Sequence, residues 1–501
     1  MTNARSRILW TLFAVVSIVS GTLIAIRFAQ GYRPSRDRLV AGNGLLVVNS
    51  TPKGARVFIN DRFTTATDDT LYLDPGEYTV SIQKDGYFTW NKTVQVEQEL
   101  VTQANALLFP TAPSLSPLTF SGAEHLAPSP DGQRIAFYSA SSSAQTKNGY
   151  YVHELSDNPL AFQRGSRQIA QVSELFPAEE TQMLWSPNSS QLILISPYKA
   201  VLLDPSRLND LNELTDISFQ LNTILSQWEE EMYLRDRERL AVFPAEIQQI
   251  ATQSAVNVYF SPDEEKVLYT ATESFTLAEN ILPSKPASNT QPQERTTEIG
   301  GIYIYDRKED RQFRIGTDEQ YLTALATKNA DADQTSNAVE TTTTQHSTTV
   351  DQLDLRTLNG DDAVAGDTDS VQEPQFNPQK VLLANDLYQR PVSLESSPSA
   401  FQRLQDADGD IDRTIISFKT YHSPLFSHGF QWFPNSYHII THDATGITIT
   451  EYDNTNAVRI YSGPFENSFV YPWPNGSRLI IQTNFNQGTS VPINLYTIDL
   501  K

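Results

Sequence analysis

Two groups of side chains in this 501-residue sequence have types and spacings that could bind a metal ion. The first group places four carboxylates at alternate positions, at Asp406, Asp408, Asp410 and Asp412. Carboxylates gathered in this way suit a hard cation such as Ca²⁺. However, Ile411 stands where the EF-hand loop requires glycine, and Ser417 stands where it requires the closing Glu. We interpret the segment as an acidic surface loop, with a calcium site as the alternative.

The second group contains four of the seven histidines, His422, His428, His438 and His442. Imidazoles bind zinc, but His438 and His442 lie four residues apart on a predicted strand. At ~3.3 Å per residue their Cα atoms are ~13 Å apart, too far for both side chains to ligate one ion. We therefore expect no metal site here.

No known catalytic motif is present. The sequence lacks a nucleophile elbow, an HExxH motif, a phosphate-binding glycine loop and a dinucleotide fingerprint. It also contains no cysteine, which excludes disulfides, thiolate metal sites and catalytic thiols. We predict a protein that is not an enzyme and that has no catalytic or cofactor-binding residues. The absence of cysteine also favours a bacterial protein.

The composition indicates a folded, acidic protein. Apolar residues make up 39% of the chain, and the length suits two or three domains. The net charge of −22 argues against a nucleic-acid partner, because an acidic surface repels phosphate backbones.

The N-terminal segment has the pattern of a membrane anchor. Residues Ile8 to Ile26 contain no charge, and a helix of this length, at ~1.5 Å per residue, just crosses a hydrocarbon layer of ~30 Å. Arg27 stands where a signal-peptide cleavage site would need a small residue, which argues against a cleaved leader. We predict a single transmembrane helix over residues 8–26, preceded by a cytoplasmic N-terminus (1–7) and followed by a linker (27–43).

The orientation of this helix rests on two opposing observations. Two arginines precede the apolar run and four follow it, which by the positive-inside rule would place the large domains in the cytoplasm. The types of domain that follow suit the outside of the cell. We predict a single-pass protein of the cell membrane with its large domains extracytoplasmic.

Residues 44–110 are predicted to form a small β-sandwich. Short apolar runs such as Leu45 to Val48 alternate with turn sequences at regular spacing. Three segments resemble the PEGA domain, a bacterial surface β-sandwich: Ser50-Thr51-Pro52 with Gly54-Ala55, then Pro75-Gly76-Glu77-Tyr78, then Lys84-Asp85-Gly86-Tyr87. We assign no ligand to these residues, because Pro, Gly and Tyr here suit turns and core.

Residues 120–501 contain a motif that recurs five times without a gap. Each copy has a Pro followed by Asp or Asn, which opens a tight turn, and two apolar residues at the fifth and sixth positions after that Pro. The motif prolines are Pro130, Pro187, Pro262, Pro434 and Pro474. We predict that the fifth position after each Pro, and the aromatic residues two positions before it (Trp185, Phe260 and Trp432), are buried between neighbouring sheets.

The five repeats resemble Tol-type and WD-type propeller repeats, which also form the propeller of prolyl peptidases. The resemblance implies a β-propeller, and the long interval between Pro262 and Pro434 suggests a degenerate blade, so we expect six or seven blades. The fold class is therefore all-β, with a transmembrane helix, a PEGA-like sandwich and a propeller. We expect no separate hydrolase domain of the kind that accompanies the propeller in these peptidases.

Three segments are predicted to be insertions in the propeller. Residues 217–251 have apolar residues at helical spacing, including Leu221, Leu225 and Trp228, which indicates a helical insertion packed on the core. Residues 283–298 and 327–376 are polar and poor in apolar residues, which predicts disordered loops.

These features favour a membrane-anchored scaffolding or binding protein of the cell envelope. Its propeller would engage a glycan, a peptide or an envelope protein. Two alternatives remain: an envelope hydrolase of glycosidase type that uses carboxylates in the propeller channel, and a structural component of a surface coat.

Overall fold

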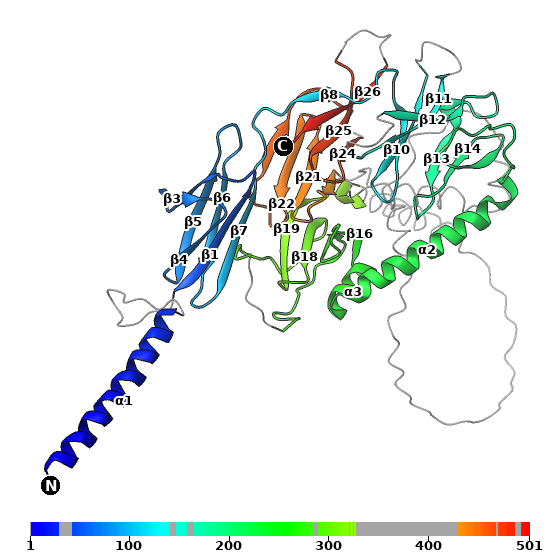
Figure 1. Ribbon diagram of the computed structural model, residues 1–501. Coiled ribbons are helices and arrows are strands. Elements are labelled where there is room, and N and C mark those ends of the chain that lie inside the picture. Colours follow the sequence, from blue (N-terminus) through cyan, green and yellow to red (C-terminus); the bar gives the residue numbers. More distant parts are fainter. Residues whose placement is uncertain are drawn as a thin grey trace, which may run out of the picture.

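The computed structural model describes residues 2–29, 43–140, 147–157, 165–283, 289–326 (except 320 and 324), 429–466, 469–485 and 492–501 (Figure 1). The described residues form one long N-terminal helix, a sandwich of two small sheets, and five further sheets accompanied by two helices.

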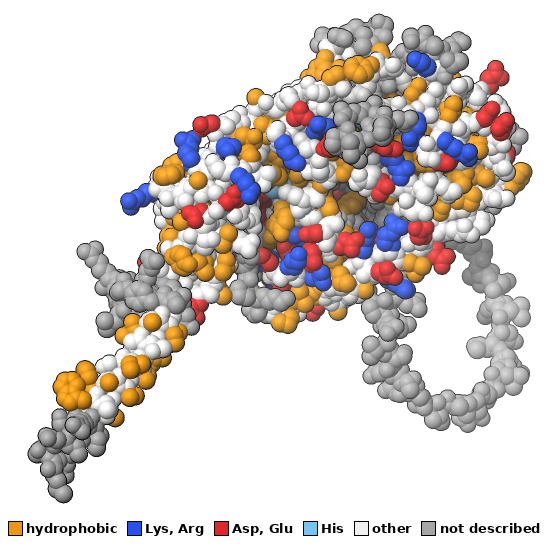
Figure 2. Space-filling view, viewed as in Figure 1, with side chains coloured by type: hydrophobic (Ala, Val, Ile, Leu, Met, Phe, Trp, Pro, Cys, Tyr) orange, Lys and Arg blue, Asp and Glu red, His pale blue; other side chains and the backbone are white. Residues whose placement is uncertain are grey.

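Helix α1 (Thr2–Ala29) extends away from the rest of the molecule (Figure 1). Its apolar side chains are exposed along the described stretch, with Trp10 at 70% and Leu23 at 58% (Figure 2). We expected residues 8–26 of this helix to cross a membrane. In the part of the chain that the structure describes, no helix meets the combined length and hydropathy needed for a membrane span.

The sandwich consists of a three-stranded sheet, in the order β4-β1-β7, and a four-stranded sheet, in the order β3-β2-β5-β6. Alternate residues of the long strands are buried, as the alternating sequence requires. The core between the sheets includes Leu46, Val57 and Trp90. The strands are β1 (Gly44–Thr51), β2 (Arg56–Ile59), β3 (Arg62–Ala66), β4 (Asp69–Leu73), β5 (Gly76–Gln83), β6 (Trp90–Val96) and β7 (Val101–Leu107).

Five sheets follow, which we number 1 to 5 in chain order of their repeat motifs. Sheet 1 is β9 (Glu124–Pro128), β10 (Arg134–Ser139), β11 (Gly149–Glu154) and β12 (Ser166–Gln171). Sheet 2 is β13 (Gln182–Trp185), β14 (Leu192–Ile195) and β15 (Ala200–Leu203), preceded by the short helix η2 (Ala178–Glu180). Sheet 3 is β16 (Ala255–Phe260), β17 (Lys266–Ala271), β18 (Gly301–Asp306) and β19 (Arg311–Thr317).

Sheet 4 is β20 (Phe430–Trp432), β21 (His438–Asp443), β22 (Gly446–Glu451) and β23 (Val458–Tyr461). Sheet 5 is β24 (Val470–Pro472), β25 (Arg478–Thr483) and β26 (Asn494–Asp499), to which β8 (Leu115–Pro117) pairs as the fourth strand. The first strand after the sandwich therefore completes the last sheet, and the repeat region begins a few residues before the predicted boundary at 120.

Each repeat motif forms a β-hairpin with the same register. The residue two before the motif Pro pairs with the residue five after it in every copy: Pro128 with Ile135, Trp185 with Leu192, Phe260 with Val267, Trp432 with Ile439, and Pro472 with Leu479. The five residues after the turn are all buried, which confirms that part of the prediction. Trp185 and Trp432 are buried too, but Phe260 is only partly buried because it faces a cavity.

The turn of each hairpin is held by its Asp or Asn. In the first copy, Asp131 Oδ1 accepts hydrogen bonds from the Gln133 amide (3.0 Å) and from Ser129 Oγ (2.5 Å). The second residue after the motif Pro has a positive φ in all five copies, at Gly132, Ser189, Glu264, Ser436 and Gly476. The local sequence thus gives the turn the same shape in all five copies of the motif.

Neighbouring sheets share hydrophobic clusters. Sheets 1 and 2 share one cluster, sheets 5 and 1 a second, sheets 4 and 5 a third, and sheets 3 and 4 a fourth. Sheets 3 and 4 pack directly on each other, and no sheet of the described residues lies between them. The described residues form five such sheets, where we had expected six or seven blades.

Two helices lie between sheets 2 and 3. Helix α2 (Leu221–Ala241), which follows the short helix η3 (Ser218–Gln220), packs through Leu225 and Trp228 on sheet 2. Helix α3 (Ala245–Gln253) packs through Ile247 on sheet 3, and Pro244 forms its N-cap. These helices occupy the segment where we expected a helical insertion, and the apolar stripe of α2 belongs to the core.

The second expected disordered loop, 327–376, lies outside the described residues. The first, 283–298, differs from the expectation over residues 289–298. Asn289 Nδ2 donates to Asp453 Oδ2 (2.7 Å), and the Gln291 side-chain amide donates to the Thr93 carbonyl of the sandwich. Asn289 and Gln291 are therefore buried and held in place by hydrogen bonds. The low apolar content of the segment does not predict this order.

The sandwich is joined to sheet 4 by a buried ion cluster. Lys92 Nζ lies 2.7 Å from Glu451 Oε2 and 2.5 Å from Asp453 Oδ2, and Trp90 Nε1 donates to the other Glu451 oxygen. Burial lowers the pKa of Lys92, but the two carboxylates outweigh this effect and raise it overall. Beside this cluster, the ring of Phe109 packs edge-on against Phe433 of sheet 4, with the ring centres 6.0 Å apart.

Candidate binding site between the sheets

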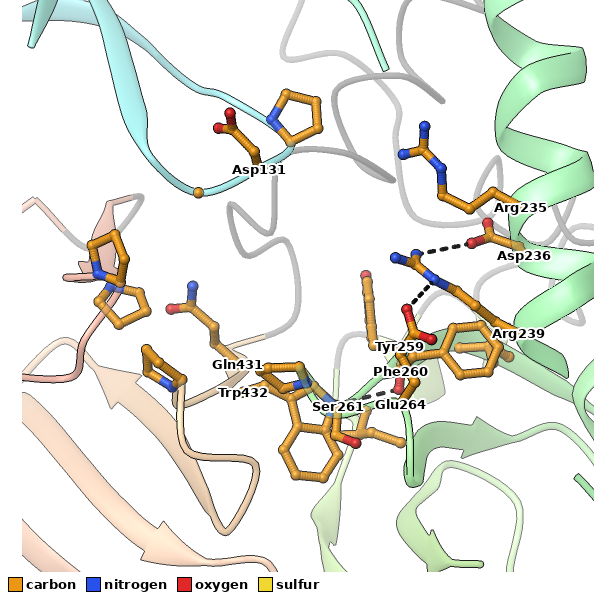
Figure 3. Close-up of a pocket in the computed structure, with 18 of the residues that line it drawn as sticks. Asp131, Arg235, Asp236, Arg239, Tyr259, Phe260, Ser261, Glu264, Gln431 and Trp432 are labelled. Carbon is orange, nitrogen blue, oxygen red and sulfur yellow. Dashed lines mark hydrogen bonds and ion pairs between the residues drawn. The ribbon is translucent and has the colours of Figure 1, made fainter. Parts of the chain in front are cut away.

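A cavity of about 490 Å³ lies where the repeat turns meet α2 (Figure 3). Its walls come from the motif turns of sheets 1, 3, 4 and 5, from strands β16, β17, β20 and β24, and from α2. Four of the five motif prolines line it, namely Pro130, Pro262, Pro434 and Pro474. The size and mixed lining are typical of a ligand site in a protein.

The repeats position these walls through bonds between successive turns. Ser189 Oγ of sheet 2 accepts a hydrogen bond from the Asp131 amide of sheet 1 (3.0 Å). The same contact links sheets 4 and 3, where Ser436 Oγ accepts from the Asp263 amide (2.9 Å). In both pairs the serine occupies the positive-φ position of its own turn. Each of these serines therefore shapes its own turn and attaches that turn to the turn of the neighbouring sheet.

Aromatic side chains form part of the lining. Tyr259, Phe260, Trp432 and Tyr471 all reach the cavity. Trp432 Nε1 donates to the Tyr259 carbonyl (3.4 Å), which fixes the indole against the neighbouring sheet. Burial raises the pKa of the Tyr259 and Tyr471 hydroxyls, so both stay neutral.

The charged wall of the cavity is built around one guanidinium. Arg239 of α2 donates from Nη1 to Asp236 Oδ1 (3.3 Å) and from Nε to Glu264 Oε1 (2.8 Å), so it lies between two carboxylates (Figure 3). Burial raises the pKa of Asp236 to about 6, although Arg239 acts in the opposite direction. Arg235, one turn earlier on α2, bonds to Glu231 (3.0 Å) and to the Pro187 carbonyl (3.2 Å).

Two buried side-chain oxygens at the cavity have no hydrogen-bond partner among the described residues. They are Asp236 Oδ2 and Gln431 Oε1, and both residues are more than nine-tenths buried. Both atoms accept hydrogen bonds. The cavity thus offers acceptors to a ligand that carries donors.

Most of the metal candidates from the sequence are not among the residues that the structure describes. Asp406, Asp408, Asp410, Asp412, His422 and His428 lie outside the described residues. His438 is buried between the rings of Phe109 and Phe433, and its burial, together with nearby Lys92, lowers its pKa to about 3. Within the described ranges no group of three or more His, Cys, Asp or Glu residues is arranged to hold a metal ion.

Sequence reasoning missed the charged residues of α2. The apolar stripe that indicated the helix ends at Met232, but its spacing continues through Arg235, Asp236 and Arg239. A stripe that changes from apolar to charged while keeping its spacing would have indicated that this face leaves the core and reaches a cavity.

Comparison with known proteins identifies the sandwich. The PEGA domain family matches residues 43–111, so this part of the chain is a PEGA domain, as predicted. The Asn60-Asp61 turn forms a tight hairpin between β2 and β3, with both residues at positive φ. Among curated proteins, none matches the chain.

Several solved structures are similar to the chain at low levels. A protein described as TolB from Agrobacterium tumefaciens is 10% identical, with 75% of this chain and 76% of that chain covered and a TM-score of 0.20. TolB from Acinetobacter baumannii is 9% identical, with 85% and 60% covered and a TM-score of 0.18. An auxiliary nutrient binding protein from Bacteroides thetaiotaomicron is 8% identical, with 92% and 78% covered and a TM-score of 0.16. These TM-scores are too low to support an argument about fold or function.

Proposed function

We propose that this chain is a membrane-anchored protein of the cell envelope that binds a peptide segment of a partner protein in the cavity between its sheets. The observation that carries the proposal is the composition of the cavity. Aromatic rings, prolines and two buried acceptors that have no partner among the described residues converge there from separate repeats and from α2. A peptide presents both apolar side chains and backbone N–H donors, which fit such a lining.

The proposal includes closure of the five sheets into a propeller. Four shared clusters join the sheets in the order 2-1-5-4-3, and α2 and α3 cover the faces of sheets 2 and 3 that remain. β8 ties the start of the ring to its last sheet. In this arrangement the helices take the place of a blade, and the cavity lies near the centre of the ring.

Anchoring is proposed for α1, with the PEGA domain and the sheets outside the cell. Support comes from its exposed apolar side chains and from the uncharged run of residues 8–26. External protease added to intact cells should cleave the chain beyond residue 43. Full protection of those domains, or a mature N-terminus beyond residue 20, would contradict the proposal.

A matched pair of substitutions tests the cavity. Gln133 and Ser190 are both exposed and occupy the same position in the turns of sheets 1 and 2, but only Gln133 lines the cavity. In affinity capture of partners from detergent-solubilised membranes, Gln133→Trp should abolish capture and Ser190→Trp should not. Equal capture by both variants would show that the partner binds elsewhere.

One observation favours a second candidate, a hydrolase that uses carboxylates in the cavity. Asp236 has a pKa near 6, which suits a general acid, and Glu264 is held by the same Arg239. Hydrolysis of chromogenic glycosides by the full chain, abolished by Asp236→Asn and by Glu264→Gln, would support this candidate over a binding protein.

A further inference from the structure

We propose that the α2 wall of the cavity recognises a positively charged group of the bound peptide, the ammonium of a lysine side chain, beside Asp236 and Glu264. This inference rests on the proposed function, since it names the chemistry of the peptide bound at the same site.

The balance of charge at the wall favours a cation. Arg239 is the single guanidinium between the two carboxylates, so the three side chains together carry one negative charge when both acids are ionised. Arg235 also acts on Asp236, but it forms an ion pair with Glu231, so this pair adds no net charge to the wall. Asp236 is more than nine-tenths buried, and its Oδ2 has no partner among the described residues.

An anionic ligand fits the same wall poorly. Arg239 uses Nε and Nη1 on the carboxylates, and Arg235 uses both Nη atoms on Glu231 and on the Pro187 carbonyl. The chain as a whole has a net charge of −22, which attracts cations and repels anions over a distance.

The aromatic lining supports the same ligand class. Phe260 and Tyr259 come from the strand that leads into the Glu264 turn, and both line the cavity with Asp236 (Figure 3). Aromatic faces attract ammonium groups, and their planes pack well against the methylene chain of lysine. A carboxylate pair beside aromatic rings therefore provides for both parts of a lysine side chain.

Binding should depend on pH because protons compete with the ligand for Asp236. The charged groups that act on this carboxyl are Arg239 and Arg235 of α2 and Glu264 of the adjacent turn. With the pKa of Asp236 at about 6, lowering the pH to 5 leaves about one-tenth of the carboxyl ionised, so lysine binding should weaken about tenfold.

The test measures binding of fluorescein-labelled pentapeptides to the full chain in detergent, by fluorescence anisotropy. The peptides are capped at both ends and carry lysine, N-acetyllysine, norleucine or glutamate between apolar residues. A fifth peptide carries norleucine and a free N-terminus, which distinguishes a terminal ammonium from a side-chain ammonium. At pH 7.5 the lysine peptide should bind about tenfold more tightly than the norleucine or N-acetyllysine peptide, as expected for about 1.4 kcal/mol. Tighter binding of the free N-terminus than of the lysine peptide would overturn the assignment to lysine.

Two variants and a control assign the effect to the wall. Asp236→Asn and Glu264→Gln should each reduce the preference for lysine over norleucine, and retained norleucine binding would show that the variants are folded. Glu238→Gln removes a charge from an exposed position of α2 outside the cavity and should keep the full preference. Equal binding of the lysine and norleucine peptides to the unmodified chain would overturn the cation site and leave peptide binding intact. If none of the peptides binds, both the cation site and the peptide-binding cavity are wrong.

Discussion

Burial raises the pKa of Asp236 from 3.8 to about 6, so folding is linked to protonation of this carboxyl. The folded protein holds the proton to a higher pH than the unfolded chain does. The contribution of this group to stability is therefore fully present below pH 3.8 and is lost as the pH rises to about 6. The shift corresponds to a loss of about 3 kcal/mol at neutral pH.

Asp236→Asn should remove this penalty, because the amide remains neutral at every pH. We expect the variant to have a free energy of unfolding about 2–3 kcal/mol higher than the unmodified chain at pH 8, and an equal one near pH 3.5. Chemical denaturation across this range measures the difference. Glu238→Gln on the exposed face of α2 is the control and should leave the pH profile unchanged. If the free energies of unfolding of Asp236→Asn and of the unmodified chain changed with pH in parallel, the carboxyl would be ionised without cost in the folded protein.

The register of the repeats makes a second prediction at single residues. Leu192 and Ile439 occupy the fifth position after their motif prolines and are at most 1% exposed. Truncating either to Ala should lower the free energy of unfolding by ~2–5 kcal/mol, through lost burial and a residual cavity. Gln133→Ala, in an exposed turn, should cost less than ~0.5 kcal/mol. Similar costs at both kinds of position in urea unfolding would contradict the register.

At the scale of elements, the hairpins could be predicted because their determinants are local. The motif Pro presets φ, the following Asp or Asn bonds back to the turn, and the pair of apolar residues requires a strand that is buried on both faces. The number of sheets could not be predicted in this way. A long interval between motifs does not reveal whether it contains a sheet, and the packing of sheet 3 on sheet 4 depends on side chains far apart in the sequence.

The candidate site was less predictable than the fold. Its prolines belong to the repeats that the sequence revealed, but its charged wall lies on α2, in an insertion. Residues 289–298 illustrate the same limit, because their order depends on Thr93 and Asp453, partners from two distant segments. Polar segments that hydrogen-bond to distant partners lack the apolar pattern from which order is predicted.

Helix α2 should stabilise the repeat sheets because it covers sheet 2. Leu225 is 1% exposed in the cluster that joins this helix to the sheet, whereas Leu234 of the same helix is 42% exposed. We expect Leu225→Ala to lower the free energy of unfolding by ~2–5 kcal/mol, and Leu234→Ala to lower it by less than ~1 kcal/mol. Urea denaturation monitored by tryptophan fluorescence provides the measurement. An equal, small effect of both changes would mean that α2 is a peripheral attachment.

At the scale of the whole molecule, the PEGA domain and sheet 4 are joined by a buried ion cluster. The side chains of Lys92, Glu451 and Asp453 are 11%, 9% and 0% exposed, so their charges are shielded from solvent. Burial raises the pKa of Glu451, whereas Lys92 holds the pKa of Asp453 below its usual value in spite of burial. The cluster therefore keeps a buried charge pair intact at the contact between the two domains.

Removing the cation of this junction should separate the two domains. Lys92→Met leaves Glu451 and Asp453 buried without their counter-ion, which costs ~3–5 kcal/mol for a buried pair. We expect two separate unfolding transitions in calorimetry in place of coupled unfolding, with the sheets melting at a lower temperature at pH 8. The triple variant Lys92→Met, Glu451→Gln, Asp453→Asn should recover most of the loss, because no unpaired charge remains. Lys53→Met is the control, since Lys53 is 83% exposed in its ion pair with Asp68. An unchanged melting profile for Lys92→Met would show that the other contacts, such as those of Phe109 with Phe433 and of Gln291 with Thr93, hold the domains together without the ion cluster.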